Sequence, residues 1–310
     1  DYGKNQKVID YFLCISRELG RRIIYLCKTF KQATGNKLLT GVFYSPLSIL
    51  GFHTEGQSYY REVMDSEWVD FWANPWAYQG RYEGENLFMN APVSSLHMRN
   101  KVYITECDIR TSDTGNRNLG APLNEWGDLM NIRKNLARLI TYNSYGYWFE
   151  MRFGWFENEK IFQGFKEASD ISTLALSLDR TRNAEIAVIY DIDSIFYASE
   201  WLNYITLIRE TIQEMGYIGA DYDIFTTDDI PKLDTSKYKL FIFPNAFALK
   251  DRTREEIKKY LQKDNKVILW IYAPGLINPD RSPALSTKYM EELTGIKLDY
   301  VEGRHGSKQR

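Results

Sequence analysis

The chain has 310 residues, 44% of them hydrophobic and 26% charged, and this composition predicts packed domains and excludes wholesale disorder. A formal net charge of −2 gives no electrostatic reason to expect nucleic acid or an acidic membrane as a partner. Three cysteines without metal-like spacing and three scattered histidines favour neither a disulfide framework nor a zinc site, so no metal or cofactor is expected.

Two further features of the composition bear on function. The sequence contains 22 Tyr, 16 Phe and 8 Trp, and aromatic rings stack on the apolar faces of sugars as well as filling protein cores. No apolar run approaches the roughly 20 residues of a membrane span. The aromatic content mildly favours a carbohydrate ligand, and the compartment, cytoplasmic or periplasmic, stays open.

Helix-like and strand-like segments alternate over residues 1–183. Apolar spacing predicts helices over 8–32, 58–64, 124–142 and 162–178, and strands over 37–44, 68–73, 102–106 and 146–152. Strands separated by helices form parallel βαβ units, and four such units are half of an eight-stranded (β/α)8 TIM barrel. The first helix would then follow a strand absent from this sequence. We therefore expect 1–183 to be the C-terminal half of a barrel, from a larger protein.

Residues 184–310 have a different character. Strands are predicted over 184–190, 222–225, 239–243 and 266–272, and helices over 201–215, 252–261 and 283–293. This order predicts a flavodoxin-like, doubly wound α/β domain. Because the segment lacks GxGxxG, GxxxxGK[ST] and Gly-x-Cys-x-Gly motifs, a structural or oligomerising role is favoured over a second active site, with nucleotide binding as the alternative.

Polar and aromatic residues follow each of the four strands of the first domain. They stand at Tyr44, at 74–78, at 106–110 and at 148–155. In a barrel these strand ends converge on one face, where catalytic residues meet. Strand alternation would put Glu106 and Asp108 on the same side. A sugar-sized cleft is the prediction, and a set of solvated loops is the alternative.

Several segments resemble bacterial glycoside hydrolases of the beta-galactosidase type. The resemblance rests on 37–44, on 68–78 and on 90–111, which carries a Glu-x-Asp-x-Arg-Thr pattern downstream of Pro-x-x-Ser. Residues 147–155 resemble the eighth barrel strand of that family. Residues 184–190 and 238–275 resemble the trimerisation domain that follows its barrel.

The resemblance implies a retaining glycosidase of barrel clan A that cleaves a β-linked glycoside such as a β-galactoside. With 146–152 as the eighth strand, Glu106 matches the nucleophile after strand seven, and the acid/base glutamate would lie upstream of Asp1. The implied partners are a glycoside or oligosaccharide substrate and further copies of the chain, as in a trimer. The chain alone is expected to be inactive.

The strand ends supply the expected substrate-binding residues. Tyrosines, tryptophans and arginines there can stack on a sugar or hold the nucleophile, and Asp108 and Glu150 can bind hydroxyl groups. The alternatives are core packing for each tryptophan and a structural ion pair, for instance with Asp108, for each arginine. The expected set is Tyr44, Asn74, Tyr78, Arg81, Asp108, Arg110, Trp148, Glu150 and Trp155.

A non-catalytic carbohydrate-binding or assembly protein that keeps the cleft is the alternative of a different functional class. The feature that distinguishes it from an enzyme is the acid/base glutamate. A retaining glycosidase needs two carboxyl groups, and Glu106 supplies one of them.

Overall fold

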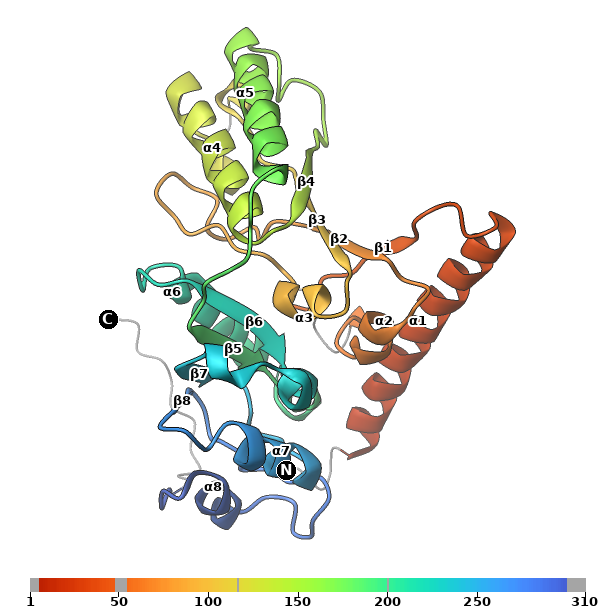
Figure 1. The fold of residues 1–310 in the computed structure, drawn as a ribbon, viewed down its shortest axis with the longest axis vertical. Helices are drawn as coiled ribbons and strands as arrows, with labels where there is room; N and C mark the ends of the chain where they lie inside the picture. The colour runs from red at the N-terminus through yellow and green to blue at the C-terminus, as the bar shows by residue number, and fades with distance from the viewer. Residues whose placement is uncertain (1–5, 48–54, 116, 200, 300–310) are drawn as a thin grey trace.

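The computed structural model describes residues 6–47, 55–115, 117–199 and 201–299 (Figure 1). Two four-stranded sheets, each entirely parallel, organise this part of the chain. The molecule is thus a mixed α/β protein. The first sheet has the order β1-β2-β3-β4, formed by Gly41–Phe43, Phe71–Pro75, Val102–Cys107 and Tyr145–Trp148. The second has the order β6-β5-β7-β8, with β5 to β8 formed by Ile186–Tyr190, Tyr222–Thr226, Leu240–Phe243 and Val267–Trp270.

Helices connect the strands of the first sheet. The last two, α4 and α5, lie side by side next to β4 in Figure 1, and both begin at an asparagine whose side chain accepts a hydrogen bond from the first turn. The long helix α1 runs along the other end of this sheet. The helices are α1 (Gln6–Ala33), α2 (Arg61–Asp65), α3 (Val93–His97), α4 (Glu125–Thr141) and α5 (Glu159–Leu176).

The second sheet has its own helices. A π-helical segment, Trp201–Glu210, continues into α6 (Thr211–Met215) after β5. Helices α7 (Asp251–Tyr260) and α8 (Thr287–Thr294) follow β7 and β8.

The two faces of the first sheet differ in burial. Residues paired in a parallel sheet share a face, and successive residues alternate between faces. Trp72 and Tyr103 form one such pair and are fully buried in the core against the helices. The opposite face, here called the open face, carries the pairs of Glu106 with Pro75 and with Tyr147, all of which keep some solvent exposure.

The two sheets are joined by a shared core and by polar contacts. Leu47 and Phe88 pack in one hydrophobic cluster with Val188 of β5. Between α3 and β6, the hydroxyl of Ser94 donates to Asp223 at 3.1 Å. The predicted boundary between 183 and 184 falls between α5 and β5, and the division into two domains stays a prediction.

Several element boundaries differ from the sequence analysis; strand β1, for instance, covers 41–43 instead of 37–44. Strand β4 ends at Trp148 instead of 152, because the chain then bends through a loop in which Gly154 has φ 91°. Helix α8 begins at 287, since Ser286 caps it. Helix α3 lies in a segment for which the sequence analysis predicts neither a helix nor a strand. Helix α3 is stabilised by tertiary contacts, because Ser94 donates to Asp223 of β6 and Ser95 donates to Asp229 in the turn after β6.

Candidate active site

Glu106 lies near the carboxyl end of β3, on the open face of the sheet. It is half-buried, and its Oε2 accepts a hydrogen bond from the hydroxyl of Tyr147 at 2.7 Å. Tyr147 is its register partner on β4 and is 39% exposed. Burial and the Glu106 carboxylate both raise the pKa of the Tyr147 phenol. Tyr147 therefore stays neutral and can donate throughout the physiological pH range.

Asp108 was expected on the same side as Glu106, as a substrate ligand, but it is buried. Strand β3 ends at Cys107, so the alternation does not extend to residue 108. Asp108 accepts a hydrogen bond from Nη2 of Arg81 at 2.7 Å, and both side chains are about 1% exposed. Three further N–H groups of the guanidinium donate to the backbone carbonyls of Trp76, Ala77 and Asp108. This pair matches the structural alternative for the arginine.

Tyr78 is the second aromatic residue beside Glu106. The Arg81 guanidinium lies over its ring, 4.2 Å from the centroid, and the side chain is 39% exposed. Burial, followed by the carboxylates of Asp108 and Glu106, raises the pKa of its phenol. The buried ion pair therefore supports a tyrosine that remains accessible at the site.

Three predicted substrate ligands point to the opposite face of the sheet. Asn74 pairs with Thr105, and Trp148 pairs with Cys107, which are the neighbours of Glu106 in sequence and therefore face away from it. The Asn74 amide donates to the carbonyl of Tyr44 at 2.7 Å, and Tyr44 is fully buried. The Trp148 ring packs on a phenylalanine of α5, with centroids 4.7 Å apart. The structure does not bring these three residues together with Glu106.

The other three predicted ligands hold two neighbouring loops together. Glu150 accepts a hydrogen bond from the backbone N–H of Trp155 at 2.7 Å, and the hydroxyl of Thr111 donates to the carbonyl of Trp155. Arg110 lies over the Trp155 ring at 5.5 Å. These contacts tie the loop after β4 to the loop after β3, and Trp155 is 6% exposed, so little of its ring is available for stacking.

Tyr147 is the site residue that sequence reasoning missed. It stood within the predicted last strand, but the sequence does not encode which residue of the neighbouring strand it meets. Had the register been known, the alternation of strand side chains would have placed it with Glu106.

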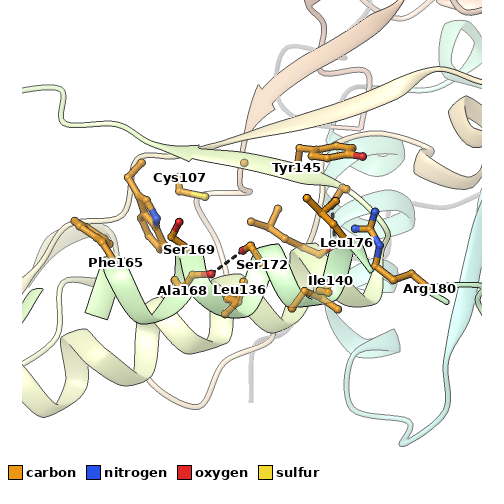
Figure 2. A pocket seen from close by; sticks show the side chains of 15 residues that line it. Cys107, Leu136, Ile140, Tyr145, Phe165, Ala168, Ser169, Ser172, Leu176 and Arg180 are labelled. Atoms are coloured by element: carbon orange, nitrogen blue, oxygen red, sulfur yellow. Dashed lines mark hydrogen bonds between the residues drawn. The ribbon is translucent and has the colours of Figure 1, made fainter. Parts of the chain in front are cut away.

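A cavity of about 300 Å³ lies between β4 and helices α4 and α5 (Figure 2). It is on the helix-covered side and is lined largely by apolar side chains, among them Leu136, Phe165 and Ala168. Cys107 also lines it, and burial raises the pKa of this thiol to about 12. The thiol is therefore protonated at neutral pH, and the cavity is separate from the carboxylate of Glu106.

The carboxyl edge of the second sheet is filled by protein groups. Ligands of doubly wound sheets bind where the strand order reverses, here between β5 and β7. At that point the Asn245 amide donates to the carbonyl of Asp191 and accepts from its N–H, both at 2.9 Å. Arg61, from α2 of the first part, forms an ion pair with Asp228 beyond β6. This arrangement favours a structural role over a nucleotide site.

The described ranges contain neither a metal-binding cluster nor a membrane-spanning helix. No group of three or more His, Cys, Asp or Glu side chains there is arranged to hold a metal ion. Among the helices in that part of the chain, none combines the length and apolar character needed to cross a membrane.

Comparison with known proteins gives matches to solved structures alone. No family model matches the sequence, and no curated protein matches it. A beta-galactosidase from the psychrophilic Marinomonas ef1 matches with a TM-score of 0.46 and 13% identity, over 78% of this chain and 45% of that one. A catalytic mutant of Gan42B, a GH42 beta-galactosidase from G. stearothermophilus, gives 0.45 and 11%, over 86% and 49%.

A beta-galactosidase from the Antarctic haloarchaeon Halorubrum lacusprofundi gives a TM-score of 0.43 and 13% identity, over 86% of this chain and 50% of that one. The chain thus spans about half the length of these solved structures. At these identities and TM-scores, the similarities assign no activity to the chain.

Proposed function

We propose that this chain is part of a retaining glycosidase that cleaves a β-linked glycoside such as a β-galactoside, with Glu106 as the nucleophile. The observation that carries the proposal is the placement of Glu106. It lies at the carboxyl end of a parallel strand, on the face that helices leave open, with one oxygen held by Tyr147. Within the described residues the other oxygen, Oε1, has no hydrogen-bond partner, so it is available to attack an anomeric carbon.

The proposed architecture is half of a (β/α)8 barrel followed by a flavodoxin-like domain. Four parallel strands in consecutive order, with α4 and α5 packed against one face, are what half of such a barrel would present. Strands β1 and β4 each have one edge without a partner strand in the described sheet. We infer that the remaining strands pair there. The order β6-β5-β7-β8 supports the flavodoxin-like assignment.

A retaining mechanism requires two carboxyl groups about 5–5.5 Å apart. One attacks the anomeric carbon as the leaving oxygen receives a proton from the other, and water then releases the sugar from the covalent intermediate. Asp108 is bound to Arg81 and Glu150 to the N–H of Trp155, so neither suits the second role. The acid/base carboxyl would come from the strands that complete the barrel.

Tyr78 is the residue best placed to contact the sugar. Its half-exposed ring offers an apolar surface, and Arg81 fixes the ring from its other side. In this account Arg81 and Asp108 act indirectly, by holding Tyr78 beside Glu106.

The test is Glu106→Gln in the longer protein or complex that carries the remaining strands. Hydrolysis of an aryl β-galactoside should fall by at least about 10³-fold, since the substitution removes a covalent nucleophile. Glu157→Gln, on an exposed residue of the loop after β4, is the matched control and should retain activity. Retained activity in Glu106→Gln would reject the nucleophile assignment.

If the chain belongs to a non-catalytic carbohydrate-binding protein, the longer protein should give a different result. Calorimetry would then detect binding of a β-galactoside, and no turnover would accompany it in the unsubstituted protein.

We propose an assembly role for 184–310, as a contact between copies of the chain. The edge strand β8 supports this, because Val267 and Leu269 on one of its faces are 60% and 46% exposed. Leu269→Glu should lower the molar mass measured by light scattering at micromolar concentration. A mass equal to the monomer in the unsubstituted protein would reject self-association.

A further inference from the structure

Residues 77–88 form the loop after β2 that carries Tyr78 and Arg81, and this loop also contacts α6, which precedes β6 of the second sheet. We propose, on the basis of the proposed function, that α6 positions this loop for substrate binding, with Asn86 as the positioning residue. Residues 184–310 thereby support the site directly, in addition to the assembly role.

The two ends of the loop are packed into the core of the second sheet. The backbone N–H of Ala77 donates to the carbonyl of Phe88 at 3.2 Å, which closes the loop at its base. Both side chains are buried in one hydrophobic cluster with Val188 of β5 and Ile212 of α6. The position of the loop therefore depends on the second sheet as well as on β2.

Asn86 connects the loop to α6 through both its side chain and its backbone. The side-chain amide, in a residue that is 5% exposed, donates to the carbonyls of Ile212 and Gln213 at 3.3 and 3.0 Å. The backbone N–H of Asn86 donates to the hydroxyl of Tyr217 at 3.0 Å, and Oδ1 accepts from Nη2 of Arg138. These contacts lie at the carboxyl end of α6, where a helix needs hydrogen bonds from outside itself.

Two glycines allow Asn86 to approach both α6 and the site. Gly216 has φ −69°, so its backbone does not require glycine, but a Cβ there would lie 1.9 Å from Cγ of Asn86. Gly80 has φ 77°, and a Cβ there would lie 1.9 Å from the carbonyl oxygen of Asn86. Gly80 stands between Tyr78 and Arg81 in the sequence. A displacement of Asn86 is therefore transmitted through close contacts to the residues beside Glu106.

Helix α4 holds the loop as well. Nζ of Lys134 donates to the carbonyl of Tyr82 at 2.8 Å and to that of Arg81 at 3.3 Å. The loop is thus held by helices that belong to different sheets. A local change in α6 alters the position of Tyr78 while β3, which carries Glu106, keeps its own pairing.

Kinetics of Gly216→Ala in the longer protein or complex that carries the remaining strands test the proposal. The added methyl group displaces Asn86, so KM for an aryl β-galactoside should rise about tenfold, while kcat changes by at most about twofold. The effect is on KM because Tyr78 binds the sugar and does not react. Gly219→Ala is the matched control. Gly219 has φ 72°, but no described atom lies within 4 Å of a Cβ there, so KM should stay unchanged.

Hydrogen exchange of the same proteins requires no turnover and therefore separates this proposal from the proposed function. Deuterium uptake of residues 77–87, measured by mass spectrometry, should be about tenfold faster in Gly216→Ala and unchanged in Gly219→Ala. Tyr217→Phe is a milder variant, which keeps the ring and removes only the hydroxyl that accepts the N–H of Asn86. It should also accelerate uptake in this segment.

Three results would overturn the positioning role. They are unchanged uptake in both Gly216→Ala and Tyr217→Phe, equal acceleration in Gly219→Ala, and faster uptake with an unchanged KM. Faster uptake in a protein whose Glu106→Gln variant still hydrolyses glycosides would retain the support of the loop by α6 and reject the nucleophile.

Discussion

Arg81 and Asp108 form an ion pair, 2.7 Å between Nη2 and Oδ1, in which both side chains are about 1% exposed. Every guanidinium nitrogen also has a backbone carbonyl partner. A buried pair is tolerated when its donors and acceptors are satisfied in this way, and it becomes strongly unfavourable when one partner is removed. The pair thus fixes the loop from which Tyr78 reaches the site.

Removal of the charge of Asp108 should destabilise the fold. In Asp108→Asn the guanidinium of Arg81 stays buried without its counter-ion, so the free energy of unfolding should fall by about 3 kcal/mol. Urea denaturation followed by circular dichroism measures this. The exposed pair of Arg133 and Glu167, 3.0 Å apart, is the control, and Glu167→Gln should change the value by at most about 1 kcal/mol. Equal effects in the two variants would contradict a buried structural pair.

Gly120 is a second determinant of the same loop. Its φ is 85°, and a Cβ there would overlap Cβ of Arg81 and lie 2.7 Å from the Arg81 carbonyl carbon. Gly120→Ala should therefore cost backbone strain plus a displacement of Arg81, about 3 kcal/mol in all. Gly115 has φ 62° but open space around it, so Gly115→Ala should cost only about 1 kcal/mol. Thermal unfolding of both variants checks the difference, and an equal loss would contradict the close approach.

Asp191 predicts a pH dependence of stability. It is fully buried at the end of β5, and burial, together with the Asp193 carboxylate, raises its pKa. Between the pKa of about 3.9 in the unfolded state and the raised pKa in the native state, the native state binds more protons than the unfolded state. Asp191 therefore lowers the free energy of unfolding as the pH rises through this range.

The measurement is the free energy of unfolding of the wild type and of Asp191→Asn between pH 4 and pH 8. The asparagine retains an acceptor oxygen for the Ser194 N–H but does not ionise. Relative to this variant, the wild type should lose stability progressively with increasing pH. A difference that stays constant across the range would show that Asp191 does not titrate there.

The positions of the helices and strands could be predicted from the sequence, but the pairing register of the strands could not. Alternating apolar runs located β3, β5 and α4 to within two residues, because periodicity is a local property. The register between neighbouring strands is not a local property of the sequence. It places Tyr147 of β4 opposite Glu106 of β3, and it places Asn74 of β2 opposite Thr105, on the face that packs in the core. For the same reason, the sequence identified Glu106 as a candidate and grouped with it residues from the opposite face of the sheet.

The short helix α3 could not be predicted from the sequence, for a different reason. Its sequence, Val-Ser-Ser-Leu-His, has weak helix propensity, and its serines bind Asp223 and Asp229 across the contact between the sheets. A segment stabilised by partners more than 100 residues away has no local signature.

The most direct test of the nucleophile is to trap the covalent intermediate. The protein with its complete barrel would be incubated with an activated 2-deoxy-2-fluoro-β-galactoside, which slows release of the sugar from a retaining enzyme, and its peptides would be mapped by mass spectrometry. We expect one adduct, on Glu106. An adduct on another residue, or steady hydrolysis of the aryl β-galactoside with no adduct formed, would contradict it.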